Sequence, residues 1–558
     1  MATDTVYYQV HKNKGGESLW GYKFVIIPVY TDKDIDEILR SSENKEKGES
    51  LLQKYKEYHT NAPTFWTKER DEQLLELMQY FMEQDTKDGY FLEISYFTQW
   101  ITQQANINLI KKWKLLEDVE LTHILYRVSL LIEVNDGIPI ISACISFTKE
   151  KSYSLSDLFI SHKKYFLFQV KLDAILDNLQ YIENEIPFVT LTRDDQMYLE
   201  ENKMSNSICE QLMQQLPSAL GFGKFKQMFT VSFSNEDGVD EGGLYRESLS
   251  LLVDEIQFKS NLFIPTPNFK NRTGENRNCY IPNPSCTSPK EIQQLEFFGR
   301  IIAGCILSAT QLGGLFWPTF IWKIFLDIPV DLNDFRSIDS ICFQSIEMLE
   351  NIQLYDISPE SFTEEIMLHF TIMTLDGREV DLIENGSNTL VTWERRNEYT
   401  ELVKNYRLHE LNVQFAALKR GFDFQMLSNT CIALFLPEDL KKYIVGDQNI
   451  DISILELHTS YIDCSASAPV IGYLWQTLYS FDDFQRRAFI KFTCGSSSLP
   501  SNTWPQRFSV RVTTCDDDHL PVAHTCSWEL DLPNYSSAEV LKKKLLQALE
   551  YCGDFGLA

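Results

Sequence analysis

A cysteine close to a histidine near the C-terminus is the feature of this chain with the clearest chemical potential. The segment HLPVAHTCSW, residues 519–528, places Cys526 two positions after His524 and directly after Thr525. A thiolate is a good nucleophile and a good leaving group, which suits a transient acyl carrier. His524 fits either a group that lowers the pKa of the thiol or shuttles its proton, or a loop-shaping hydrogen bond. Thr525 fits a residue that orders the loop.

The composition limits the classes of protein that can carry this thiol. The 558 residues are 44% apolar and 13% aromatic, which is typical of a globular protein with several domains. A net charge of −28 disfavours nucleic acid as a general partner. The twelve cysteines include no CxxC pair and no zinc-type spacing. We therefore expect reduced thiols, no metal and no cofactor, and a place in the cytoplasm or the nucleus.

One uncharged run has the length of a membrane span. It extends from Ile301 to Trp322 and contains a Gly313-Gly314 pair followed by Pro318. Glycine pairs and proline are turn signals, so the run predicts two buried helices with a turn between them, and no membrane partner.

The first 180 residues predict a mostly helical module of unknown role. A strand is expected within 22–30, and an amphipathic helix follows Thr67, with Trp100, Ile101 and Leu109 as core residues. A packing extension of the following segment is the favoured interpretation of this module.

Residues 185–446 have a different pattern. A strand, MFTVSF, runs into a helix, and Asp376-Gly377 joins two strands of a hairpin within 369–383. Residues 397–422 predict one long helix with Gly421 as its C-cap. The helical pattern stops again at Gly446, and the polar residues Asp447, Gln448 and Asn449 follow, so we place a hinge at 447–450 before a compact segment, 451–558.

Seven stretches together resemble one family in order and spacing. They are GVDEGGLYRE (238–247), FFGRIIAGCI (297–306), FAALKRGF (415–422), FDDFQRRAFIKFTCGSSSLP (481–500), LPVAHTC (520–526), LDLPNYSS (530–537) and FGLA (555–558). With Cys526 standing 32 residues before the C-terminus, residues 185–558 resemble the HECT family of ubiquitin ligases. The resemblance implies an α+β, bilobed domain: a mostly helical N-lobe with small β-hairpins at 185–446 and an α/β C-lobe at 451–558.

The resemblance also implies an activity and its partners. A HECT-type ligase accepts ubiquitin from a ubiquitin-conjugating enzyme as a thioester, here on Cys526, and passes it to lysines of protein substrates. Phe555 matches the family's functional phenylalanine near the C-terminus, which is thought to help the second transfer; burial that pins the tail is the alternative. The substrates, the chain linkage and the cognate conjugating enzyme do not follow from the sequence.

In the N-lobe, the family docks its conjugating enzyme in a hydrophobic groove. The resemblance places Cys342, Ile346, Leu349 and Ile352 on one wall and Ile366 opposite them. The spacing of the first four puts them on one helical face, which ordinary core explains equally well.

Two charged clusters have a structural and a functional interpretation. Asp240, Glu241 and Arg246 fit a buried ion pair, which we prefer, or a contact with the C-lobe during transfer. Residues 516–518, three aspartates, fit a solvated turn better than a site that orients the incoming lysine. The Ser527-Trp528 pair departs from the family, which has an aromatic residue directly after the cysteine.

Two other classes of function remain open. One is a non-catalytic scaffold that binds a conjugating enzyme, against which the HTC stretch and the FGLA tail argue. The other is a Cys/His hydrolase, for which no orienting Asn or Asp is identifiable in the sequence.

Overall fold

The structure is a computed structural model that describes most of the chain between residues 8 and 551. The described residues are 8–10, 24–26, 66–84, 94–103, 110–136, 138, 160–177, 186–192, 207–216, 227–234, 242–308, 310–426, 430–446, 450–495, 498–499, 507–525 and 527–551. The chain forms two compact units, residues 1–181 with 427–439 and residues 182–426 with 440–558. The break at 181–182 lies next to the boundary expected at 180, whereas the return of 427–439 to the first unit was not expected.

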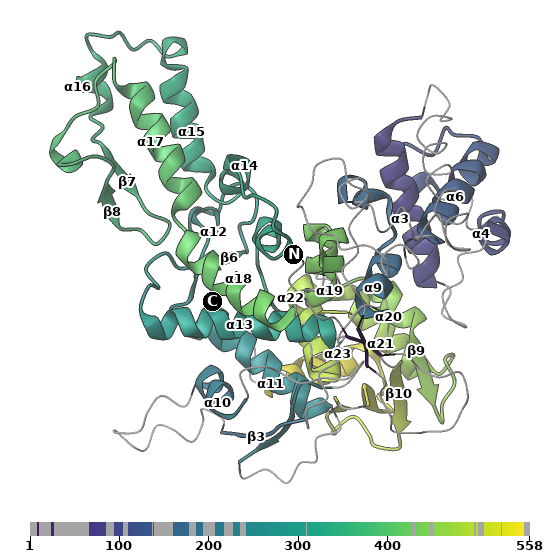
Figure 1. Ribbon diagram of the computed structural model, residues 1–558. Helices are drawn as coiled ribbons and strands as arrows, with labels where there is room; N and C mark the ends of the chain where they lie inside the picture. The colour runs from purple at the N-terminus through teal and green to yellow at the C-terminus, as the bar shows by residue number, and fades with distance from the viewer. Residues whose placement is uncertain are drawn as a thin grey trace. The chain divides into compact units, whose positions relative to one another are not determined.

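The first unit is a set of amphipathic helices around an apolar core (Figure 1). Its elements are β1 (Tyr8–Val10), β2 (Phe24–Ile26), α3 (Lys68–Gln84), α4 (Ile94–Ile101), η1 (Ile110–Lys112), α6 (Leu121–Asp136), η2 (Lys163–Tyr165), α9 (Phe168–Asp177) and η8 (Thr430–Leu434). The predicted helix after Thr67 is confirmed as α3, and Ile101 is fully buried as expected. Trp100 packs against that core, while Leu109 lies outside the described residues.

The segment 427–439 is tied to the first unit by aromatic and charged contacts. The ring of Phe435 lies 5.4 Å from that of Phe168 on α9. Lys171, also on α9, forms an ion pair of 2.6 Å with Asp439. The start of α19 (Pro437–Val445) therefore belongs to the first unit and its end to the second.

The N-lobe of the second unit consists of helices with short two-stranded sheets. Its elements are β3 (Phe188–Leu191), α10 (Ile208–Gln215), β4 (Thr230–Phe233), α11 (Gly243–Asp254), η4 (Glu255–Lys259), β5 (Phe263–Pro265), α12 (Pro267–Asn271), β6 (Tyr280–Pro282), α13 (Pro289–Leu307), η5 (Thr319–Leu326), α14 (Leu332–Arg336), α15 (Ser340–Glu350), η6 (Ile352–Leu354), α16 (Phe362–Ile366), β7 (Thr371–Met373), β8 (Glu379–Asp381), η7 (Gly386–Asn388), α17 (Arg396–His409) and α18 (Asn412–Met426). The strand expected in MFTVSF is β4, which pairs in parallel with β3. The expected hairpin is β7–β8, with Gly377 at φ +90° in its turn.

Two glycines let α13 and α18 cross in close contact. A Cβ on Gly421 would lie 1.8 Å from the carbonyl oxygen of Glu296, and one on Gly299 would lie 2.0 Å from that of Leu418. The prediction of one long helix with Gly421 as its C-cap is wrong, because the segment forms α17 and α18 and α18 continues to Met426. Gly421 is required by the helix crossing and not by a helix end.

A small subdomain, residues 331–409, contains α14 to α17 and the β7–β8 hairpin. At its base Arg407 on α17 is buried and forms ion pairs of 2.9 Å with Asp339 and 2.5 Å with Glu410. These contacts fix the start of α15 against the end of α17.

The uncharged run 301–322 is core. α13 ends at Leu307, Gly314 adopts φ +90°, and Trp317 and Trp322 are fully buried. The second predicted helix is the 3-10 helix η5. Throughout the described residues, every helix is too short or too polar to cross a bilayer.

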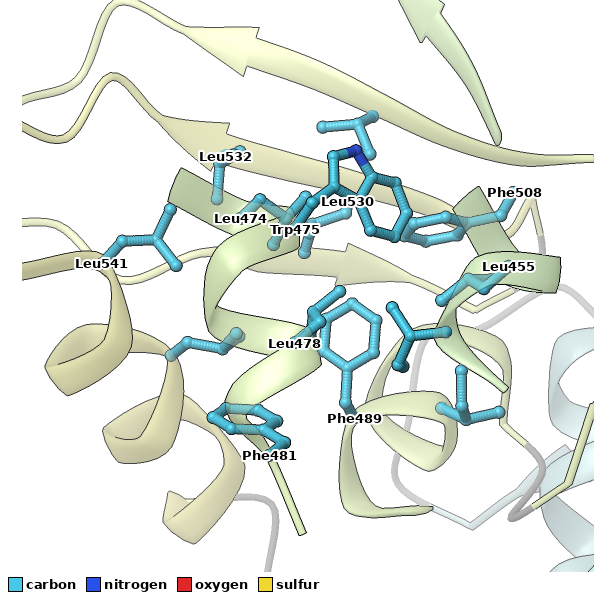
Figure 2. Packing of buried hydrophobic residues seen from close by; sticks show 14 of the residues in the cluster. Leu455, Leu474, Trp475, Leu478, Phe481, Phe489, Phe508, Leu530, Leu532 and Leu541 are labelled. Atoms are coloured by element: carbon cyan, nitrogen blue, oxygen red, sulfur yellow. The ribbon is translucent and has the colours of Figure 1, made fainter. Parts of the chain in front are cut away.

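The C-lobe packs helices against a four-stranded sheet in the order β11-β12-β10-β9. Its elements are α20 (Ile452–Leu457), β9 (Thr459–Ile462), α21 (Pro469–Ser480), α22 (Asp483–Cys494), β10 (Phe508–Thr513), β11 (Val522–His524), β12 (Glu529–Pro533) and α23 (Ala538–Tyr551). β10 runs parallel to both neighbours and β11 is antiparallel to β12. Figure 2 shows Trp475 and Phe489 from the helices packed with Phe508 and Leu530 from the strands. Together with the helical N-lobe, this sheet makes the domain α+β.

Gly446 ends α19 at the junction of the lobes. It adopts φ +80°, and a Cβ there would lie 2.7 Å from the carbonyl oxygen of Leu499 and 2.8 Å from Oγ of Ser498. Asp447, Gln448 and Asn449 lie outside the described residues. Movement about 447–450 stays a prediction.

Candidate active site

The HTC stretch is the connection between two strands of the C-lobe sheet. β11 ends at His524 and β12 begins at Glu529, and these two residues face each other in the antiparallel register. The backbone N–H of Ser527 donates to the carbonyl of His524 at 3.2 Å, which closes the turn. Cys526 belongs to this turn by sequence, and its own position lies outside the described residues.

His524 is paired with a carboxylate from the neighbouring strand. Its Nε2 lies 3.1 Å from Oδ2 of Asp531, and half of the His524 side chain is exposed. Asp531 follows Glu529 by two positions, so both side chains lie on the same face of β12. Arg511 on β10 forms an ion pair of 2.7 Å with Glu529. The result is a row of charged groups across three strands, next to the turn that contains Cys526.

Asp531 is the carboxylate that the sequence analysis did not identify. The LDLP stretch contained the necessary clue. A short turn after His524 places every second side chain of the next strand, including that of Asp531, on the same face of the sheet as His524. Recognising it required the register of β11 against β12, which the sequence alone does not fix.

Trp528 anchors the turn in the core. Its side chain is only 4% exposed and belongs to the C-lobe core, and its φ is +52°. Its carbonyl accepts a hydrogen bond of 2.9 Å from the backbone N–H of Ser509 on β10. The unusual Ser527-Trp528 pair therefore ends the turn with a buried residue, and the left-handed backbone turns the chain into β12.

Thr525 contacts the N-lobe through its backbone. Nη2 of Arg246, on α11, donates a hydrogen bond of 2.9 Å to the carbonyl oxygen of Thr525. This contact with the C-lobe was the less favoured of the two interpretations of Arg246. Asp240 and Glu241, which were considered with it, lie outside the described residues.

The three aspartates of residues 516–518 make local contacts. Oδ1 of Asp516 lies 2.9 Å from Nδ1 of His519, and Asp517 accepts a hydrogen bond of 2.8 Å from the backbone N–H of Ser536. The hydrogen bond with His519 lowers the pKa of Asp516, and hydrogen bonds from the hydroxyl and then the backbone N–H of Ser536 lower the pKa of Asp517. Asp517 thus ties the turn to the segment before α23, which favours the structural interpretation over the lysine-orienting one.

The residues expected to line the docking groove are mostly buried. Ile346 and Leu349 on α15 are 3% exposed and Ile352 is fully buried. Cys342 and Ile366 are half-buried, and burial raises the pKa of the Cys342 thiol. For Ile346, Leu349 and Ile352 this burial agrees with the core interpretation of their helical spacing, and the groove that the resemblance implies stays a prediction. Exposed apolar residues of the same subdomain include Ile341, Leu354, Tyr355, Met367 and Met373.

Comparison with known proteins agrees with this geometry. The profile of the HECT-domain (ubiquitin-transferase) family matches residues 250–558, more than half of the chain. The chain belongs to the HECT family. The matched range contains the whole C-lobe and begins inside α11, four residues after Arg246. Phe555, expected to act in the HECT tail, lies outside the described residues.

Several HECT relatives are described as E3 ubiquitin-protein ligases. Over 341 residues the chain is 33% identical to RSP5 of Chaetomium thermophilum, an alignment that covers 59% of this chain and 40% of the relative. Over 355 residues it is 33% identical to the TOM1-like ligase of Neurospora crassa, covering 61% and 8%. Over 334 residues it is 29% identical to human HERC2, covering 58% and 7%. The alignments thus span less than half the length of these relatives.

Proposed function

We propose that this HECT protein is a ubiquitin-protein ligase that accepts ubiquitin as a thioester on Cys526 and transfers it to substrate lysines. The observation that carries the proposal is the HTC turn, with Cys526 between β11 and β12 of a HECT C-lobe. The names of the relatives support the same activity.

The proposed reaction consists of two acyl transfers. In the first, the Cys526 thiolate attacks the thioester carbonyl of a charged conjugating enzyme; a new S–C bond forms and the thiolate of that enzyme leaves. In the second, a lysine amine attacks the new thioester; an amide forms, the Cys526 thiolate leaves, and the amine loses a proton. His524, held by Asp531 and half exposed, is the side chain available to take that proton.

The conjugating enzyme is proposed to dock on the exposed apolar residues of the small subdomain. Leu354 is 78% exposed and Met367 is 71% exposed, which is unusual for large apolar side chains. Leu354 is the last residue of η6, which begins at Ile352, and Met367 directly follows Ile366 at the end of α16. The proposed partners of this HECT protein are a conjugating enzyme, ubiquitin and protein substrates of unknown identity. We propose that it acts in the cytoplasm or the nucleus.

A single-turnover assay on the full chain tests the proposal. A panel of charged conjugating enzymes is mixed with the protein, and ubiquitin adducts are resolved with and without reductant. We expect a reducible adduct on the wild type and none on Cys526→Ser or Cys526→Ala. A reducible adduct on Cys526→Ala would contradict the assignment of the nucleophile.

The same assay separates the two other classes of function. A scaffold would bind a conjugating enzyme without any adduct. A Cys/His hydrolase, for which the His524–Asp531 pair supplies the missing carboxylate, would cleave a ubiquitin ester without transfer to lysine. Mass spectrometry of the product of a successful transfer would identify the chain linkage.

A further inference from the structure

One side chain of the N-lobe reaches the turn that carries the proposed nucleophile. Arg246 and Thr525 are 279 residues apart in the chain, and their hydrogen bond of 2.9 Å is partly buried. The carbonyl oxygen of Thr525 belongs to the peptide bond that joins it to Cys526. Whatever holds this oxygen therefore also restrains the backbone of the next residue.

Arg246 extends from a firmly packed part of the N-lobe. It lies in the first turn of α11, directly after Tyr245, which is 3% exposed and whose hydroxyl lies 3.4 Å from the backbone nitrogen of Met228. Gly242 precedes the helix at φ +99°, and a Cβ there would lie 3.4 Å from Nη1 of Arg246. The guanidinium thus folds back over the start of the helix and lies against residue 242.

On the C-lobe side, Thr525 is also held by neighbouring residues. Thr525 lies beside Gly495, which ends α22 at φ +71°, and a Cβ on Gly495 would lie 3.8 Å from that of Thr525. Trp528 fixes the other end of the turn in the C-lobe core. Both ends of the turn are packed within the C-lobe. One further contact from the N-lobe, the hydrogen bond from Arg246, is then enough to fix the orientation of the turn.

Within the described residues, other contacts join the lobes without touching the turn. Near the hinge, Oγ of Ser498 donates a hydrogen bond of 2.5 Å to the carbonyl oxygen of Val445. Lys491 on α22 forms an ion pair of 3.0 Å with Asp254 at the end of α11. Arg487, also on α22, lies with its guanidinium carbon 5.4 Å from the ring centre of Phe316. These contacts dock the C-lobe, whereas Arg246 docks the turn itself.

This docked arrangement is suited to the second transfer. α11 packs against β4 and α10, whereas the proposed docking residues Leu354 and Met367 belong to the small subdomain around α15 and α17. A turn held by α11 therefore faces a part of the N-lobe other than the one proposed to carry the conjugating enzyme. The first transfer requires the turn to face that enzyme, so the contact with Arg246 belongs to the step that follows.

We propose that Arg246 is a positioning residue for the discharge of ubiquitin to lysine. It acts through the carbonyl of Thr525 to hold the thioester turn against the N-lobe while the amine attacks. The inference rests on the proposed ligase function, and it concerns the second transfer alone. A hydrogen bond from a charged donor is strong enough for its loss to slow that step by about 10- to 100-fold.

The test measures the two transfers separately in the full chain. Thioester formation is followed in a single turnover with a charged conjugating enzyme. After recharging is stopped, discharge is followed by adding free lysine. The variants are Arg246→Met, which keeps an apolar stem without a donor, and Arg246→Lys, which keeps one charged donor. Asp254→Asn is the matched control, because it weakens a contact between the lobes that does not reach the turn.

We expect Arg246→Met to form the thioester within about twofold of the wild-type rate, which also shows that it is folded, and to discharge about 10- to 100-fold more slowly. Arg246→Lys should recover part of the loss, and Asp254→Asn should discharge within about threefold of the wild type, as expected for a surface ion pair. Equal slowing of both steps, an unchanged discharge rate in Arg246→Met, or no difference between the Lys and Met variants would overturn the inference. If the wild type forms no thioester, both the proposed function and this inference fail. If the wild type forms the thioester, the discharge rates of the variants test the role of Arg246 alone.

Discussion

The glycine at the crossing of α13 and α18 allows a stability prediction whose sign is opposite to helix propensity. Replacing glycine by alanine inside an ordinary helix stabilises it by roughly 0.5–1 kcal/mol. At position 421 the added Cβ would lie 1.8 Å from the carbonyl oxygen of Glu296 and 2.7 Å from its carbon. Both atoms are backbone, so no side chain can rotate away to make room.

The size of the effect follows from the movement that the helices would need. Ordinary contact begins at 3.4 Å, so α13 and α18 would have to separate by about 1.5 Å at the crossing. Forcing an extra carbon into a packed interior costs typically 1–3 kcal/mol, and more when backbone must shift. We expect Gly421→Ala to destabilise the second unit by about 1–3 kcal/mol after the gain in propensity is subtracted.

Gly472→Ala is the matched control for this substitution. Gly472 also lies within a helix, α21, and a Cβ there would meet nothing within 4 Å. This variant should be stabilised by roughly 0.5–1 kcal/mol, as propensity alone predicts. The two alanine variants should therefore differ from each other by about 1.5–4 kcal/mol.

The assay combines urea unfolding with hydrogen exchange. A chain of two compact units need not unfold in one transition, so exchange resolved by peptide is required to locate the loss. Peptides from α13 and α18 should exchange faster in Gly421→Ala, while peptides from α3 in the first unit should not change. If Gly421→Ala unfolds at the urea concentration of the wild type or above it, the close helix crossing is refuted.

Three further predictions concern the small subdomain. Burial would raise the pKa of Asp376, but hydrogen bonds, the first from Ser285, hold it at about 2; this stabilisation is complete above about pH 4 and is lost as the pH falls toward 2. Asp376→Asn should therefore be less stable than the wild type at pH 7. The difference in the free energy of unfolding, measured by urea titration, should shrink below pH 4; a difference that does not change with pH would contradict the low pKa of Asp376. Ile346→Ala should cost about 2–5 kcal/mol of stability because Ile346 is buried. Leu354→Ala should leave stability within about 0.5 kcal/mol and slow thioester formation; the opposite pattern would favour docking in the groove that the resemblance implies.

Features that depend on near neighbours in the chain were predictable from the sequence. The spacing of apolar residues gave the helix that follows Thr67, alternation gave β4, and the Asp376-Gly377 pair gave the turn of the β7–β8 hairpin. In each case the residues that determine the structure lie within one turn or one strand of each other.

Features that depend on distant partners were missed for physical reasons. A glycine near the end of a helical pattern looks like a C-cap, and only the carbonyl of Glu296, more than a hundred residues away, shows that Gly421 is a crossing point. The spacing of Ile346 and Leu349 marks a helical face, but it does not say whether a partner or the same subdomain covers that face. The role of Asp531 beside His524 likewise required the strand register.

The contacts between the lobes are of a kind that permits them to separate. Among the described residues, the C-lobe core is built from positions 450 to 549, so its apolar packing does not depend on where the lobe docks. The described contacts of α22 and the HTC turn with α11 are polar: Lys491 with Asp254, and Arg246 with the carbonyl of Thr525. The Lys491–Asp254 ion pair is partly exposed, and such a pair contributes about 0–1 kcal/mol. The hydrogen bond from the charged Arg246 contributes about 1.5–3 kcal/mol, so the two contacts together are small enough for the lobe to undock. A lobe with its own core, docked on α11 by such contacts, fits the proposed cycle, in which the lobe would leave α11 to meet a conjugating enzyme and return for discharge.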